Sequence, residues 1–366
     1  METRKYYLDW LRVLAFLFLV LFHVGMLYVA WPYNIKSPRL VPQAEWAMSA
    51  LAAWRLALLF FISGVASRFL IAKLGAGRFA LDRLRRLLPV ILFGMFVVIP
   101  PQTYVELVSK GVTHQDYLSF WLHSYLAADQ TLVRPLHKTM PTWDHLWFLV
   151  YLLVYALGFA AVFAISRRAK AVPHPLPLVL LLIAPALWLA AANVAIWQKP
   201  LTHALVNDGA GHLKWAGMFV IGALCAMQEP FWQWVRTYPA ALLALAAGLY
   251  ALENMVDDPL WSVVSGLYAW AAICALCGYA YRYLNRPSAL LSHLNEAVLP
   301  IYVLHQPILL IAAYLIFPLR LPLAAEAGLL AAITGFGSFA IYELAIRPWW
   351  LMRFVFGLKP RPASVA

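Results

Sequence analysis

Long apolar stretches separated by short polar segments recur from one end of the 366-residue chain to the other. A helix needs about 20 predominantly apolar residues to cross the hydrocarbon core of a bilayer. Ten stretches approach that length, and they predict membrane-spanning helices at 9–30, 46–71, 88–106, 144–166, 178–197, 214–228, 239–254, 259–282, 297–317 and 324–346. The pattern therefore predicts an all-α, polytopic integral membrane protein.

The apolar stretches leave no room for a separate soluble domain. We expect a single transmembrane domain over residues 1–366, ending in a short cytoplasmic tail at about 347–366. The first apolar segment has no small-residue cleavage site after a short core, so we expect a retained span and not a signal peptide. No internal repeat is evident, which weighs against a transporter built from related halves.

The composition agrees with a membrane protein, because 64% of the residues are hydrophobic and only 12% are charged, against about 25% charged in soluble domains. With the N-terminus inside, the ten predicted spans place 17 Lys and Arg residues on the inner side and 8 on the outer side. This asymmetry is the positive-inside bias of membrane proteins. It predicts cytoplasmic termini, and it explains much of the net charge of +12 without nucleic-acid binding.

The first span carries two ionisable groups in "RVLAFLFLVLFH", which runs from Arg12 to His23. Eleven residues make about three helical turns and a rise of about 16 Å, so both side chains share one face. Such groups are costly at membrane depth and indicate function. Arg12 could bind the phosphates of an acyl-coenzyme A donor, with Asp9 holding its guanidinium, and His23 could deprotonate an attacking hydroxyl. The alternative is that Arg12 reaches the interface and His23 bonds a carbonyl.

A second basic cluster, "RLRR", lies in a predicted cytoplasmic segment. Arg83 and Arg86 are three residues apart and share a helix face. We expect them to bind the donor's phosphates; the alternative is a topology determinant that contacts anionic lipid head groups.

Three further segments carry candidate residues. In "WDHLWFLVYLL", His145 beside Trp147 could orient a sugar hydroxyl, or the aromatic residues could form an interfacial belt. In "LPIYVLHQPI", His305 lies near the middle of its span in a supporting role, or simply bonds carbonyls that the neighbouring prolines free. In "FFISGVASRF", Ser63 is expected to serve close helix packing and remains a candidate oxyanion donor.

Other enzyme signatures are missing. The chain has no GxSxG elbow, no glycine-rich phosphate loop and no HExxH pair. We therefore expect neither a metal nor a cofactor. Cys225, Cys274 and Cys277 lie in apolar spans, and we expect them to pack as small hydrophobic residues.

Together these motifs resemble the type-three membrane acyltransferase family over nearly the whole chain. The resemblance rests on the first-span arginine and histidine, the Arg-x-x-Arg, "FFISG" and "IYVLHQP". It implies a multi-pass enzyme of the bacterial inner membrane with a catalytic His23 and donor-binding Arg12, Arg83 and Arg86. Many relatives carry a glutamate-rich motif where this chain has "HLWFL", so His145, a second catalytic candidate, is a departure from the family pattern.

Within the family, "YYLDWLR" and "IYELAIRPWWLMRFVFGLKP" look most like members that succinylate periplasmic glucans. The resemblance implies O-acyl transfer from cytoplasmic acyl-coenzyme A, with succinyl as the expected group, to a periplasmic glycan hydroxyl within membrane lipid. His23 would act as general base or relay the acyl group through a covalent intermediate. Alternatives are an acetyltransferase for another envelope polysaccharide, a secondary transporter, because buried histidines and arginines also build ion pathways, and a non-catalytic scaffold.

Overall fold

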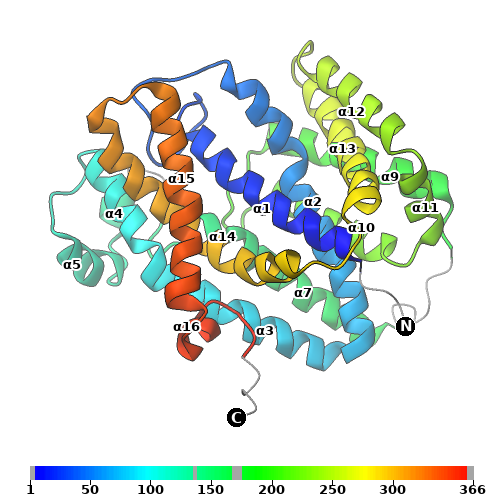
Figure 1. Ribbon diagram of the computed structural model, residues 1–366, viewed down its shortest axis with the longest axis horizontal. Helices are drawn as coiled ribbons and strands as arrows, with labels where there is room; N and C mark the ends of the chain where they lie inside the picture. The colour runs from blue at the N-terminus through cyan, green and yellow to red at the C-terminus, as the bar shows by residue number, and fades with distance from the viewer. Residues whose placement is uncertain (1–4, 135–137, 167–174, 361–366) are drawn as a thin grey trace. The chain divides into compact units, whose positions relative to one another are not determined.

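The computed structural model describes residues 5–134, 138–166 and 175–360 (Figure 1). This part of the chain is helical, and no strand occurs in it. The prediction of an all-α, polytopic membrane protein is thus confirmed. The last six residues of the predicted tail and five of the inner basic residues counted above lie outside the described ranges, namely Arg4, Arg167, Arg168, Lys170 and Arg361.

Eight helical segments of the described chain are long and apolar enough to span a membrane. They correspond to eight of the ten predicted stretches. Several contain a change of helix type, as where α3 continues through a π-helical turn into α4. The eight segments are α1 (Tyr6–Met26), α2 (Ala44–Leu74), α3 (Ala76–Phe93) with η1 (Gly94–Val98) and α4 (Pro100–Ser109), η4 (Asp144–Leu146) with α7 (Trp147–Ile165), α9 (Leu178–Gln198), α13 (Leu260–Leu284), α14 (Ala289–Ile316) with η5 (Phe317–Leu319), and α15 (Leu323–Ile341) with η6 (Tyr342–Ile346).

The other two predicted stretches are helical but do not qualify as full spans alone. Helix α10 (Gly209–Cys225) passes the span test only together with α11 (Glu229–Thr237), and the two are bent by 98°. Helix α12 (Pro239–Glu253) has 15 residues, which corresponds to about 22 Å at 1.5 Å per residue. The apolar pattern located these helices, but it carries no information about a bend. The short helices are α5 (Tyr117–Ser119), η2 (Phe120–Tyr125), α6 (Gln130–Val133) and α16 (Trp350–Val355).

The chain forms two compact units whose segments alternate along the sequence. Unit 1 comprises residues 1–15, 49–83 and 151–292, and unit 2 comprises residues 16–48, 84–150 and 293–366. Each boundary between the units falls within a helix. All three candidate histidines belong to unit 2.

In unit 1, α2 and α10 approach each other backbone to backbone. A Cβ atom on Gly64 would lie 1.9 Å from the carbonyl oxygen of Phe219, and one on Gly222 would lie 2.0 Å from that of Phe61. Only glycine fits such contacts, which are typical of tightly packed membrane helices. This explains "FFISG" by packing and agrees with the packing interpretation of the neighbouring Ser63.

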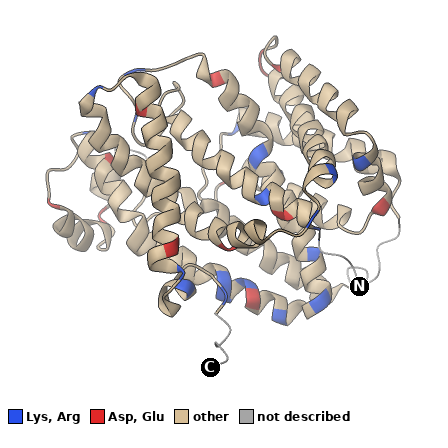
Figure 2. Cartoon of the chain, in the orientation of Figure 1, with Lys and Arg blue, Asp and Glu red and all other residues tan. Residues whose placement is uncertain are grey.

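In unit 2, two apolar cores fix the elements around the candidate site. The first joins the end of α1 to α14 and α15, with Val24, Leu27, Leu309, Leu310 and Leu330 among its members. The second joins α4 to the segment that follows it and contains Leu107, Phe120, Tyr125, Val133 and Met140. Charged positions are sparse along α15 and gather along α3 (Figure 2), as expected if α15 faces lipid and part of α3 lies at a surface.

Candidate active site

Three histidines from three separate elements lie together in unit 2. His23 comes from α1, His145 from η4 and His305 from α14. Nδ1 of His23 lies 2.7 Å from Nε2 of His305, and the two rings are nearly parallel at 14°, with centroids 4.9 Å apart. The ring of His145 stands edge-on to that of His305 at 5.4 Å. The structure thus brings together both predicted catalytic histidines and the supporting one.

The backbone of α14 orients two of these rings. Nδ1 of His305 lies 2.6 Å from the carbonyl oxygen of Tyr302, and Nε2 of His145 lies 3.1 Å from that of Val303. Val303 is four residues before Pro307, which has no N–H to donate to it. The carbonyl that Pro307 frees is therefore used by His145, whereas the sequence had suggested His305 as its partner.

Both rings are buried, and the hydrogen bonds around His145 determine which of its nitrogens carries the hydrogen. His305 is fully buried and His145 is 6% exposed, and the hydroxyl of Tyr302 donates to the backbone carbonyl of His145. Because a carbonyl only accepts, Nε2 of neutral His145 carries its hydrogen and Nδ1 holds a lone pair. Nδ1 is buried and has no hydrogen-bond partner in the described part of the chain. It is thus available to a donor on a ligand.

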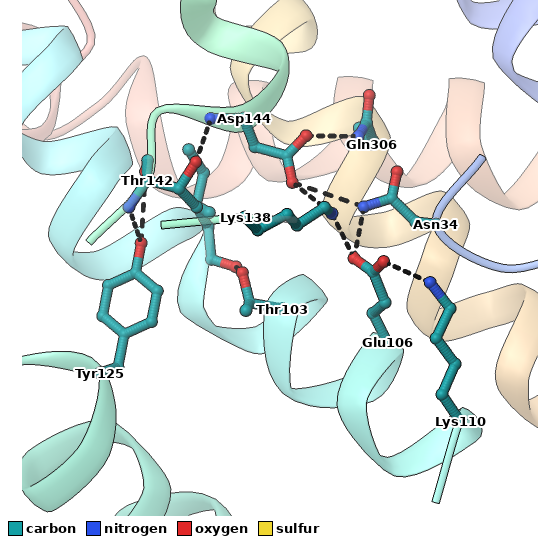
Figure 3. Close-up of polar contacts among 10 residues, drawn as sticks. Asn34, Thr103, Glu106, Lys110, Tyr125, Lys138, Thr142, Asp144 and Gln306 are labelled. Carbon is teal, nitrogen blue, oxygen red and sulfur yellow. Dashed lines mark hydrogen bonds and ion pairs between the residues drawn. The ribbon is translucent and has the colours of Figure 1, made fainter. Parts of the chain in front are cut away.

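A polar cluster next to the histidines, which we call the Glu106–Asp144 cluster, ties η4 to α4 (Figure 3). Glu106, only 1% exposed, accepts hydrogen bonds from Lys138 at 2.5 Å, Lys110 at 2.7 Å and Asn34 at 2.7 Å. Asp144 faces Lys138 at 3.6 Å and Asn34 at 3.4 Å. Two carboxylates and two ammonium groups balance, as buried charges require. The cluster fixes the segment that carries His145.

The cluster also affects the protonation of its lysine. Burial lowers the pKa of Lys138, but the carboxylates of Asp144 and Glu106 oppose burial more strongly, and the net pKa is raised above its ordinary value. Lys138 therefore remains charged at neutral pH. Glu106 and Asn34 were not among the predicted site residues. The available signal for Glu106 was an acidic residue at the end of an apolar stretch, four residues before Lys110.

The predicted donor-binding residues lie on two helices. Arg12 contacts Asp9 at 3.4 Å, as expected, and α1 is unbroken from Tyr6 to Met26, so about 16 Å separates the levels of Arg12 and His23 along its axis. Arg83 and Arg86 both lie in α3, where Arg83 stacks over Phe79 at 5.2 Å. Their role in donor binding stays a prediction.

The remaining candidates have simpler surroundings. Trp147 is the first residue of α7, and Ser63 belongs to unit 1, whereas the histidines belong to unit 2. The cysteines Cys225, Cys274 and Cys277 are free and buried. Among the described residues, no three His, Cys, Asp or Glu side chains are grouped so that they could hold a metal ion.

Comparison with known proteins places this helical architecture in a family. Residues 5–343 match a family model described as an acyltransferase domain, acyltransferase family 3. The chain belongs to this family of membrane acyltransferases. It is also similar to glucans biosynthesis protein C from Salmonella paratyphi B, Salmonella dublin and Salmonella enteritidis, each 23% identical over 98% of this chain and 95% of the relative. None of the solved structures matches the chain significantly.

Proposed function

We propose that this acyltransferase moves a succinyl group from cytoplasmic acyl-coenzyme A to a hydroxyl of a periplasmic glucan or related glycan, in the inner membrane of a bacterium. The name of its relatives, glucans biosynthesis protein C, supports a glucan acceptor. The observation that carries the chemistry is the hydrogen-bonded pair of His23 and His305.

The hydrogen bonds of the pair support Nε2 of His23 as the proposed base. His305 Nδ1 faces a carbonyl oxygen, so it carries the hydrogen, and in the neutral ring Nε2 is then the acceptor. His23 must donate to it through Nδ1, which leaves the lone pair on His23 Nε2. When Nε2 takes a proton, His305 and the Tyr302 carbonyl stabilise the imidazolium through the same two hydrogen bonds.

The reaction follows from this arrangement. His23 Nε2 removes the proton of a sugar hydroxyl as its oxygen attacks the thioester carbon. The tetrahedral intermediate then collapses, the carbon–sulfur bond breaks, and the leaving thiolate takes the proton back from His23. His145 Nδ1 accepts a hydrogen bond from a hydroxyl of the glycan. Arg12, Arg83 and Arg86 bind the phosphates of coenzyme A.

Reconstitution in proteoliposomes of known orientation tests the function. Succinyl-coenzyme A is supplied on the face that exposes α3, and a glucan is enclosed with the opposite face. We expect succinylated glucan, identified by mass spectrometry, with free coenzyme A remaining on the donor side. Transfer only when donor and glucan share a side would contradict transfer across the membrane, and intact donor on the far side would indicate a transporter.

A further inference from the structure

Unit 2 contains a cavity of about 580 Å³ that the mechanism above does not use. Three segments line it: the loop after α1 (within 33–38), the end of α4 (109–110), and the stretch where α14 ends in η5 (within 314–320). The volume falls within the range of about 300–1,000 Å³ typical of small-molecule sites. By the charge asymmetry of the sequence, these segments are on the predicted outer side.

Two of the three cations in the cavity wall, Lys36 and Lys110, are committed to partners within the protein, and Arg320 is the third. The ammonium of Lys36 donates to the backbone carbonyls of Met26 at 2.6 Å, Trp31 at 2.8 Å and Val29, which uses its three donors. Lys110 pairs with Glu106. The one remaining guanidinium, that of Arg320, does not match the several phosphates of coenzyme A. A largely uncharged ligand therefore fits the cavity better.

The rest of the lining suits a carbohydrate. Tyr314, Phe317 and Tyr33 supply aromatic surface, and Asn34 and Ser109 supply polar atoms. A pyranose ring has an apolar C–H face that packs against aromatic rings and a rim of hydroxyls that needs a few placed hydrogen bonds. Mostly apolar walls with a small number of polar groups are typical of sites with such ligands.

Tyr33 connects the cavity to the histidine pair. Its ring lies nearly parallel to that of His23, at 13° and a centroid distance of 5.9 Å. Its phenolic oxygen is buried without a hydrogen-bond partner among the described residues, which is costly unless a ligand supplies one. Burial, with Asp144 and Glu106, raises the pKa of Tyr33 well above its ordinary value, so the phenol remains a donor.

We propose that this cavity is the saccharide subsite of the enzyme. In it, Tyr314 and Phe317 pack against the face of the acceptor sugar, and Tyr33 donates its hydroxyl to an acceptor oxygen beside His23. This assignment rests on the proposed acyl transfer to a glycan. It commits the cavity to a largely uncharged saccharide and places the donor's phosphates elsewhere.

Two measurements on the purified full-length protein test the subsite. The first is calorimetric binding of a short unsubstituted β-glucan oligosaccharide, and the second is steady-state transfer from succinyl-coenzyme A to it. Tyr314→Ala and Phe317→Ala should each weaken oligosaccharide binding and raise its KM about ten-fold, equivalent to about 1.4 kcal/mol, with the KM for the donor unchanged. Tyr33→Phe should lower kcat about ten-fold. The matched control is Phe336→Ala, because Phe336 is 77% exposed on α15.

The outcomes separate this inference from the proposed function. Unchanged oligosaccharide affinity and KM in the Tyr314 and Phe317 variants would overturn the subsite, even with transfer intact. A rise in the donor KM alone would also overturn it, by assigning the cavity to coenzyme A. If wild-type protein binds the oligosaccharide through these residues but transfers no acyl group, the subsite holds and the proposed function fails.

Discussion

Replacing His305 with alanine should slow acyl transfer without changing substrate binding. His305 accepts the hydrogen of His23 Nδ1 at 2.7 Å and is itself fixed by the Tyr302 carbonyl at 2.6 Å. In the proposed mechanism, the variant removes the group that holds His23 in the productive tautomer and stabilises its imidazolium. His305 then acts through His23 and is a positioning residue.

The magnitude follows from the hydrogen bond that is lost. A bond to a group that becomes charged contributes about 1.5–3 kcal/mol, and about 1.4 kcal/mol corresponds to a factor of ten. His305→Ala should thus lower kcat about 10- to 150-fold, less than the loss of about 10²–10⁴ expected when a base is removed. Since His305 acts only through His23, the double variant His23→Ala/His305→Ala should be no slower than His23→Ala alone.

Steady-state transfer by purified variants checks this prediction. His305→Gln, which can still accept from His23, should recover part of kcat, and both KM values should stay near wild type. His293→Ala is the matched control, because His293 lies on the same helix and pairs with Glu343 away from the site. Wild-type kcat in His305→Ala, or multiplying losses in the double variant, would refute the relay.

Three further predictions concern the donor site and the Glu106–Asp144 cluster. Replacing Arg83 and Arg86 with alanine should weaken acyl-coenzyme A binding at least about ten-fold in a donor titration, with only partial rescue by lysine, which lacks the bidentate geometry; unchanged affinity would assign them to topology. Glu106→Gln removes a carboxylate that is 1% exposed from its lysine partners, and should lower the free energy of unfolding by about 3 kcal/mol, seen as a lower Tm. Because the pKa of Lys138 is raised in the folded state, its stabilisation is full below the unfolded pKa and is lost as pH rises through the folded pKa. The Tm difference between wild type and Lys138→Met should therefore persist from neutral pH through the ordinary pKa of lysine, about 10.4, and shrink only at more alkaline pH. A difference that is already lost between neutral pH and that ordinary pKa would contradict the assignment.

The sequence predicted the helices well because apolar length is a local property. Every predicted stretch is helical, and the depth of His23 and His305 in their spans follows from counting residues. Their contact does not, because the two residues are separated by 282 positions, and periodicity along one helix does not specify which face meets another.

The Glu106–Asp144 cluster could not be predicted from the sequence for the same reason. Glu106 ends an apolar stretch and by itself has the position of an interfacial residue, while Lys138 was one charge among several in a long loop. Only folding brings them to 2.5 Å. Pro307 did predict a freed carbonyl on α14. The partner of that carbonyl, which belongs to Val303, is His145 from a different element.

The catalytic role of His23 is tested most directly by the rate of succinyl transfer in the His23→Ala variant, measured at equal protein abundance in oriented proteoliposomes. His114→Ala, at an exposed position in the loop after α4, is the control and should match wild type. We expect a rate about 10²–10⁴ times lower for His23→Ala, with donor and oligosaccharide affinities preserved. Glucan succinylation at a rate near wild type in that variant would contradict the catalytic role of His23.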